Sequence, residues 1–325
     1  MFRRLSISAA PGEARAALEH GLALEAAGRH REAFPLFQRA TELDPSNGRA
    51  WRHLGNLLRR AGQLAAASEC FERAIASGDD RPLNEFFLSA VGVGAVVPSA
   101  PANFVRALFD QYADRFDEHL LRELRYRAPE LLAALIARSG ILSYETVLDL
   151  GCGTGLAGQR FRSTARSITG VDVSQRMLAQ AGRISAYDHL VLADMESHLL
   201  ATDCPYDLVL CCDAFIYIGN LNAVFAGVCR VLQRHGSFAF TVESCDAANG
   251  YELLPTLRYA HSEDYVRSLA NQHNFEVRGV ERGVLREEND QPIDGLTTVR
   301  LNVEQNQLVS VIGWLDSGLI GLQGA

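Results

Sequence analysis

The sequence contains no lysine, so all 31 of its permanently cationic side chains are arginines. This absence excludes Schiff-base chemistry, a lysine general base and the lysine of a Walker-type phosphate loop. Long apolar runs are missing as well, because no segment reaches the roughly 18 apolar residues of a membrane-spanning helix. The apolar stretch after Arg4 is short and ends at Pro11, which does not match a secretory signal peptide. We therefore expect a cytoplasmic protein without a membrane partner.

The seven cysteines form no CxxC pair, and no histidine stands at a spacing that would complete a zinc site. We expect reduced, mostly buried thiols and no metal ion. The net charge is −8, and residues 101–325 hold 19 arginines against 28 acidic residues. Because nucleic-acid binding depends on a positively charged surface, we expect no nucleic-acid partner.

A repeat with a period of 34 residues occupies the N-terminal third. The matching pairs are Gly21 and Gly55, Ala33 and Ala67, Phe37 and Phe71, and Ala40 and Ala74. A period of this length is typical of a helical hairpin repeat, in which small residues stand where the two helices approach each other closely. The sequence therefore predicts two antiparallel helical hairpins.

These positions resemble the tetratricopeptide repeat, although Asp79 stands where the second copy would have proline. Two repeats cannot bury their own apolar faces, so residues 82–91 are predicted to form a capping helix. Two roles are open for residues 1–92: a concave groove for a protein or peptide partner, or an arm for packing or self-association. Residues 93–103 have no periodicity and are predicted to be an extended linker.

From residue 104 onward, helical and buried-strand patterns alternate, which predicts a parallel sheet covered on both faces. The expected strands cover residues 146–150, 167–172, 189–193, 206–212, 236–243, 275–281 and 296–302. A short polar turn at 287–292 leaves no room for a helix, so the last two strands should be antiparallel. The predicted fold class is α/β, with a Rossmann-like sheet of seven strands behind the all-α helical-hairpin domain.

The first strand runs into a glycine loop, DLGCGTG at residues 149–155. The loop also satisfies the dinucleotide pattern GxGxxG, so the pattern alone leaves both ligand classes open. Asp149 would face a dinucleotide pyrophosphate as an unpaired carboxylate, whereas the ammonium group of S-adenosylmethionine would be attracted to it. The glycines let the backbone lie against the ligand. We therefore expect S-adenosylmethionine as the cofactor.

Two further strand ends carry acidic residues. Asp172 ends the second strand and can accept hydrogen bonds from both ribose hydroxyls. Asp194 ends the third strand, where it can accept from the adenine amino group while Met195 packs on the ring. The full predicted cofactor-binding set is Tyr112, Asp149, Gly151, Cys152, Gly153, Gly155, Asp172, Val173, Met177, Asp194, Met195 and Asp213.

Residues 104–302 resemble class I methyltransferases in the glycine loop and in four further segments. These segments are FDQYADRFD at 109–117, GVDVS at 170–174, ADM at 193–195 and VLQRHGS at 231–237. The whole chain is similar to bacterial tetratricopeptide-repeat methyltransferases described as trans-aconitate-methyltransferase-like. The resemblance implies that Tyr112 lies over the methionine end of the ligand. For Phe116 we favour the apolar face of a helix. Residues 303–325 extend past the fold as a tail without an assigned role.

Methyl transfer is an in-line displacement, so a general base is needed only if the acceptor must lose a proton. The acceptor should bind at the strand carboxyl ends. His261 and Tyr217 are candidate catalytic residues, and Arg258, Tyr259 and Glu243 are candidate substrate residues. The alternative for His261 is that it merely precedes Ser262, which would cap the next helix.

Three functions fit these features. The first is a methyltransferase that acts on a small molecule, with an acidic metabolite or natural-product intermediate as one candidate acceptor. The second is a protein or peptide methyltransferase whose repeats recruit the substrate. The third is a non-catalytic repeat scaffold that binds S-adenosylmethionine.

Overall fold

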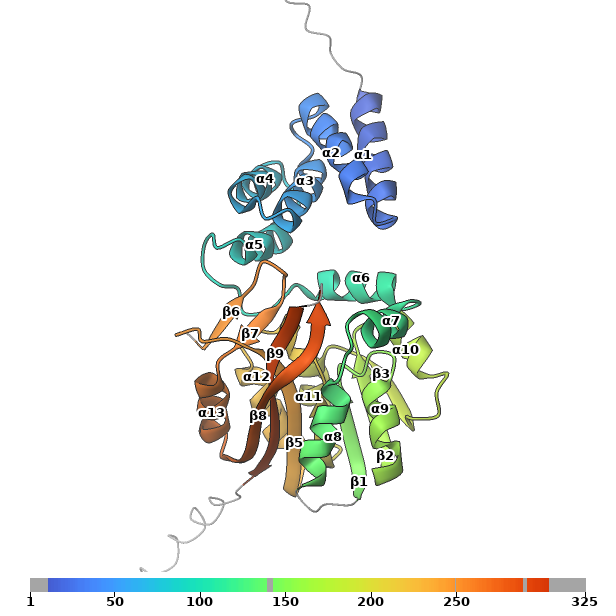
Figure 1. The fold of residues 1–325 in the computed structure, drawn as a ribbon, viewed down its shortest axis with the longest axis vertical. Helices are drawn as coiled ribbons and strands as arrows, with labels where there is room; N and C mark the ends of the chain where they lie inside the picture. Colours follow the sequence, from blue (N-terminus) through green and yellow to red (C-terminus); the bar gives the residue numbers. More distant parts are fainter. Residues whose placement is uncertain (1–10, 139–142, 249, 289–290, 304–325) are drawn as a thin grey trace, which may run out of the picture.

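The computed structural model describes residues 11–138, 143–248, 250–288 and 291–303. Figure 1 shows a group of helices from the N-terminal part of the chain above a twisted sheet with helices on both faces. The tail that the sequence analysis placed at 303–325 lies outside the described residues from 304 onward. Among the described residues, no helix is long and apolar enough to cross a membrane.

The N-terminal part consists of five helices. They are α1 (Pro11–Ala26), α2 (His30–Leu43), α3 (Gly48–Arg60), α4 (Leu64–Ala76) and α5 (Arg81–Ala90). The 34-residue period has a steric cause, because Gly21 lies against the ring of Phe37 and Gly55 lies against the ring of Phe71. A Cβ atom at either glycine would lie 2.7 Å from the facing ring. The two helical hairpins expected from the repeat are therefore present.

Helix α5 occupies the position predicted for the capping helix. The side chain of Asp80 accepts a hydrogen bond from the backbone N–H of Leu83 and caps its N-terminus. Phe86 and Phe87 are buried, and Phe87 packs against Phe71 of the second hairpin with ring centroids 5.2 Å apart.

The segment between the repeats and the sheet is held at several points. The N–H of Ala100 donates to the carbonyl of Tyr217, and Ser99 forms an isolated bridge with Ile218. The hydroxyl of Tyr259 donates to the carbonyl of Val97 at 2.8 Å. One apolar cluster runs from the helical hairpins through this segment to Tyr259. The repeats are therefore packed on the second domain.

The second domain contains a nine-stranded sheet. Its strands are β1 (Tyr144–Leu150), β2 (Ala165–Asp172), β3 (His189–Leu192), β4 (Tyr206–Cys211), β5 (Leu232–Ser244), β6 (Tyr251–Leu253), β7 (Tyr259–His261), β8 (Phe275–Glu288) and β9 (Gln291–Val303). The parallel order is β3-β2-β1-β4-β5, after which β9 joins β5 antiparallel and β8 pairs with β9. All seven predicted strands are present, and the predicted antiparallel hairpin at the end of the sheet is confirmed.

Strands β6 and β7 were not predicted. They form a small hairpin inserted between β5 and α13, and β7 continues the sheet parallel to the end of β5. The segment 258–262, for which no strand was predicted, therefore runs largely into a sheet strand. Both strands are only three residues long, which is too short for an alternating apolar pattern to reveal.

Helices cover both faces of the sheet (Figure 1). They are α6 (Ala102–Tyr112), α7 (Phe116–Glu118), α8 (Ala128–Ala137), α9 (Leu156–Phe161), α10 (Gln175–Ala181), α11 (Met195–Ala201), α12 (Asn222–Val231) and α13 (Glu263–Gln272), with short π and 3-10 turns at His119–Glu123, Arg162–Thr164 and Phe215–Tyr217. On one face, Phe225 of α12 packs on Phe238 and Phe240 of β5. On the other, α8 packs through Leu132 and Ile136.

Candidate active site

A cavity of about 810 Å³ lies at the carboxyl ends of the parallel strands. Its floor comes from the loops after β1, β2, β3 and β4, and its cover comes from α6 and α7. A further wall comes from α1 and α3 of the repeats. Ligand pockets usually have volumes of about 300–1,000 Å³. The cavity is therefore large enough for a ligand of drug size.

The glycine loop after β1 borders this cavity through Gly151 and Gly153. Gly151, Gly153 and Gly155 have φ angles of +71°, +55° and +103°, in the left-handed region that favours glycine. A Cβ atom at Gly151 would lie 2.5 Å from the Cβ of Ala214. Glycine is therefore required at all three positions by the backbone conformation, and at Gly151 also by the close approach of the loop after β4.

Asp172, at the end of β2, holds the glycine loop in place. Its Oδ2 accepts from the N–H of Gly153 at 2.9 Å, and its Oδ1 accepts from the N–H of Ser174 at 2.8 Å. Burial raises the pKa of this carboxyl, although the two backbone hydrogen bonds oppose the rise. At the end of β3, Asp194 lines the same cavity and caps α11 by accepting from the N–H of Ser197.

The structure brings nine of the twelve predicted cofactor-binding residues to this one cavity. They are Tyr112, Gly151, Cys152, Gly153, Asp172, Val173, Asp194, Met195 and Asp213. Three others do not line it. Gly155 packs against Ile184, and Met177 is fully buried in α10. The third is Asp149.

Asp149 has a different role from the predicted one. Its Oδ2 accepts from the hydroxyl of Tyr187 at 2.7 Å, and that tyrosine packs against Gly158 and Gly170 behind the loop. The carboxyl is almost completely buried, and burial raises its pKa to about 7. Asp149 therefore anchors the packing below the loop. The expectation that it would contact a ligand ammonium group is not supported, and sequence position alone does not reveal which way the side chain turns.

The cover of the cavity is hydrogen-bonded to the loops beneath it. Asp117 of α7 accepts from the hydroxyl of Thr154 at 2.5 Å, and Asp110 of α6 accepts from the hydroxyl of Ser174 at 2.6 Å. Phe116 lines the cavity 3.7 Å from where a Cβ of Gly153 would be. Phe116 also packs against the apolar cluster that contains Leu120 and Tyr126, so it has the helix-face packing that we favoured and borders the cavity as well.

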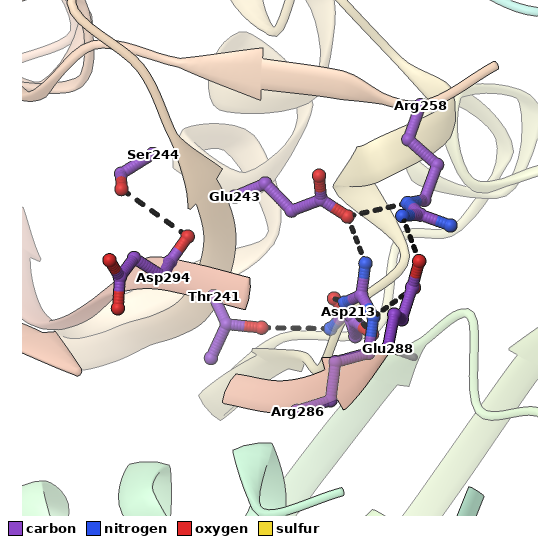
Figure 2. Close-up of polar contacts among 8 residues, drawn as sticks. All are labelled: Asp213, Thr241, Glu243, Ser244, Arg258, Arg286, Glu288 and Asp294. Atoms are coloured by element: carbon purple, nitrogen blue, oxygen red, sulfur yellow. Dashed lines mark hydrogen bonds and ion pairs between the residues drawn. The ribbon is translucent and has the colours of Figure 1, made fainter. Parts of the chain in front are cut away.

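Beside the loops that form the floor of the cavity, five buried or half-buried side chains form an ion network (Figure 2). Arg286 of β8 donates through Nη1 to both oxygens of Asp213, at 2.8 and 2.7 Å, and through Nε to Glu288 at 3.0 Å. Its Nη2 pairs with Glu243. Arg258 donates to Glu243 at 2.6 Å and to Glu288 at 2.7 Å. Three carboxylates thus share two guanidinium groups.

This network changes the interpretation of the predicted substrate residues. Arg258 lines the cavity, but its guanidinium is already paired with two carboxylates. Glu243 is 3% exposed and lies outside the cavity, as does Tyr259, whose hydroxyl bonds to Val97 in the seam with the repeats. Of the three, only Arg258 can reach a molecule in the cavity.

Two tyrosines besides Tyr112 line the cavity. Tyr217 follows β4, where the sequence placed it, and its ring packs against that of Phe109 of α6 with ring centroids 5.3 Å apart. Tyr126 was not predicted and lies near Asp213. Burial raises the pKa of both phenols, so both remain neutral hydroxyls near neutral pH. Arg286 and Glu288 were also missed, because nothing in a strand pattern marks their charges as inward-facing.

His261 does not line the cavity. It is completely buried, and its Nε2–H donates to the backbone carbonyls of Ile218 and Gly219 at 2.9 and 3.1 Å. Burial lowers its pKa to about 4. The structure therefore supports the alternative interpretation, in which His261 is a core residue ahead of the helix cap Ser262, and it does not support a role as general base.

We expect the His261→Gln variant to retain any activity of the wild type within a few fold and to lose a pH dependence of stability. Below pH 6.5 the unfolded chain takes up a proton on His261, whereas the folded chain does so only near pH 4. Wild-type stability should therefore fall between these pH values by a few kcal/mol. Urea denaturation between pH 4 and 7 measures this, with exposed His189→Gln as control. A large loss of activity in a folded His261→Gln protein would contradict the structural role.

Among the described residues, no group of three or more His, Cys, Asp or Glu side chains is placed to hold a metal ion. Their cysteines are free. Cys70, Cys152 and Cys211 are buried as expected, whereas Cys212, Cys229 and Cys245 are half-buried and Cys204 is exposed.

Comparison with known proteins finds a similar family for each part of the chain. Residues 147–236 match a family model described as a methyltransferase domain, and residues 24–83 match one described as a tetratricopeptide repeat. The chain is 34% identical over 164 residues to a malonyl-[acyl-carrier protein] O-methyltransferase of Enterobacter lignolyticus, covering 50% of this chain and 61% of that protein. It is 36% identical over 104 residues to a putative methyltransferase, YqeM, of Bacillus subtilis, covering 30% and 42%.

The chain spans about three fifths or less of the length of these two relatives. Among solved structures, the magnesium protoporphyrin IX methyltransferase of Synechocystis PCC 6803 with bound SAH is similar at 18% identity and a TM-score of 0.47. The match covers 61% of this chain and 99% of that one.

Proposed function

We propose that this chain, which combines tetratricopeptide repeats with a class I methyltransferase domain, transfers a methyl group from S-adenosylmethionine to a small-molecule acceptor. The observation that carries this proposal is the convergence of the glycine loop, Asp172 and Asp194 on one cavity. The carboxyl ends of parallel strands are where ligands of open α/β sheets bind.

The residues of the cavity fit this donor. Asp172 is at the strand end that suits ribose hydroxyls, and each of its oxygens retains accepting capacity beyond its one backbone bond. Asp194 and Met195 offer an acceptor and an apolar surface for the adenine. Tyr112 and Phe116 on the cover would enclose the methionine end. The acidic character of these loops suits a ligand that is cationic and has no phosphate.

Bound S-adenosylmethionine supplies a methyl group that its sulfonium already activates for displacement. The chain contributes orientation and the exclusion of water. The hydroxyls of Tyr217 and Tyr126 can hold an acceptor oxygen by donating hydrogen bonds, and Phe109 and Phe116 cover the cavity. An acceptor that reacts as an anion needs no general base. Transfer to oxygen agrees with the names of the O-methyltransferase relatives.

Calorimetric titration of the purified chain tests the donor assignment. We expect S-adenosylmethionine to bind at one site per chain, and NAD to show no saturable binding. Radiolabelled S-adenosylmethionine is then incubated with the chain and native lysate, which is separated into small-molecule, protein and nucleic-acid fractions. Label chiefly in the small-molecule fraction is expected. Binding of NAD without binding of S-adenosylmethionine contradicts the proposal, and label chiefly in protein assigns a different acceptor.

A further inference from the structure

The tetratricopeptide repeats form one wall of the cavity that holds the proposed donor site. Glu25 of α1 and Asn56, Arg59 and Arg60 of α3 line the same cavity as the glycine loop. These residues lie about 90 positions or more before the glycine loop, so the fold rather than the local sequence brings them together. The repeats therefore contribute side chains to the space in which an acceptor would bind.

Arg59 is a buried cation without an anionic partner among the described residues. The residue is 9% exposed, its Nε donates to the side-chain oxygen of Asn56 at 3.2 Å, and its Nη1 donates to the carbonyl of Pro255. Both partners are neutral. Burying a charge without a counter-charge is costly, so such groups are usually paired.

The surrounding charges add to this imbalance. Arg60 is exposed, lines the cavity next to Arg59 and forms no ion pair with the described residues. Burial and the charge of Arg60 lower the pKa of Arg59 to about 10. Glu25, the acidic residue of this wall, is paired with His53 at 2.6 Å. The two arginines contrast with Arg258 and Arg286, which carboxylates already neutralise.

We propose that Arg59 and Arg60 bind an oxyanion group, carboxylate or phosphate, of the methyl acceptor, so that the repeats complete the active site and select acidic small molecules. A guanidinium group presents a planar fork of donors that matches both oxyanions. The inference rests on the proposed function, because it places the acceptor between these arginines and the loops after β1, β2 and β3, which are proposed to hold S-adenosylmethionine. It assigns the repeats a part in substrate selection in addition to packing.

The contact of Arg59 with Pro255 also joins the repeats to the β6–β7 hairpin, so a variant of Arg59 alone combines two effects. Arg60 separates them, because no hydrogen bond of its side chain holds the described structure together. The Arg60→Gln and Arg59→Gln/Arg60→Gln variants are therefore compared. Arg31→Gln is the matched control, since Arg31 is an exposed arginine of the repeats that does not line the cavity.

Calorimetry at low ionic strength measures the binding of citrate, malonate and inorganic phosphate to the full chain and to each variant. We expect at least one probe to bind wild type at one site, with affinity at least tenfold lower in Arg60→Gln, lower still in the double variant, and unchanged in Arg31→Gln. The carboxylate and phosphate arms identify the preferred oxyanion. Absence of anion binding by wild type, equal binding by the Arg60→Gln variant, or an equal loss in Arg31→Gln overturns the inference.

A parallel titration with S-adenosylmethionine separates this inference from the proposed function. Donor affinity should be the same in wild type and in all three variants, because the arginines lie on the acceptor side. If wild type fails to bind the donor, the proposed function fails, whatever the anion result. If the donor binds and the variants retain wild-type anion affinity, the inference about the repeats fails alone.

Discussion

Replacing Asp172 with alanine is expected to reduce the affinity for S-adenosylmethionine about 100-fold or more, because two charge-assisted hydrogen bonds of about 1.5–3 kcal/mol each are lost together. One of these bonds holds the N–H of Gly153, and the other holds the N–H of Ser174. Without the carboxylate, the glycine loop loses its fixed position, and the cavity loses the acceptor proposed for the ribose. Calorimetric titration of the folded variant measures the change.

The matched control for this variant is Asp203→Ala, which removes a carboxylate that is fully exposed and weakly paired with Arg230. We expect this control to bind the donor as wild type does. The isosteric Asp172→Asn variant should fall between the two, since an amide oxygen can still accept one backbone hydrogen bond. A folded Asp172→Ala protein with wild-type affinity would refute the assigned position of the donor.

The Arg286→Met variant is expected to lose about 3–5 kcal/mol of unfolding free energy, because removing one partner leaves buried charges uncompensated. Arg286 is 2% exposed and is shared by Asp213, Glu243 and Glu288. Three carboxylates would then have one guanidinium, that of Arg258. Urea denaturation near pH 7.5 measures the loss.

Acidification should narrow the difference in unfolding free energy between the Arg286→Met variant and wild type. Burial already raises the pKa of Asp213 in the folded protein, and losing the guanidinium raises it further. The folded variant therefore binds protons at a higher pH than the unfolded chain does. Its stability should rise, relative to wild type, as the pH falls from 7.5 toward 5. The control is Arg138→Met, an exposed arginine paired with Glu281, for which a change below about 1 kcal/mol is expected. An equally small effect at Arg286 would contradict the network.

The parts of the site that the sequence predicted are those encoded locally. Gly151 and Gly153 follow a buried strand directly, and Asp172 and Asp194 end the next two strands. Parallel strands bring their carboxyl ends to one edge, so these positions follow from the strand order alone. The 34-residue period could also be recognised from the sequence, because it reflects a contact within one helical hairpin, that of Gly55 with the ring of Phe71.

The parts that escaped prediction depend on contacts between distant residues. Arg286 lies 73 positions from Asp213, and Arg59 lies 196 positions from Pro255. Strand periodicity predicts on which face of the sheet a side chain lies, but not which charged side chains from other elements pair with it there. Histidine is a residue type common in catalysis, yet a three-residue strand places His261 in the core. Side-chain direction at a single position, as at Asp149, is also settled only by neighbours such as Tyr187.

The seam between the two parts of the chain has a consequence for how the protein can be divided. The cluster that includes Phe86 and Phe104 also contains Leu253, Leu257 and Tyr259 of the β6–β7 hairpin. Truncation before residue 93 would uncover this apolar surface and remove the wall that α1 and α3 contribute to the cavity. We therefore expect that residues 93–303 do not form a freestanding module. Joining these residues to a different domain would require a new apolar surface to cover the β6–β7 hairpin, and new side chains to replace the cavity wall of the repeats.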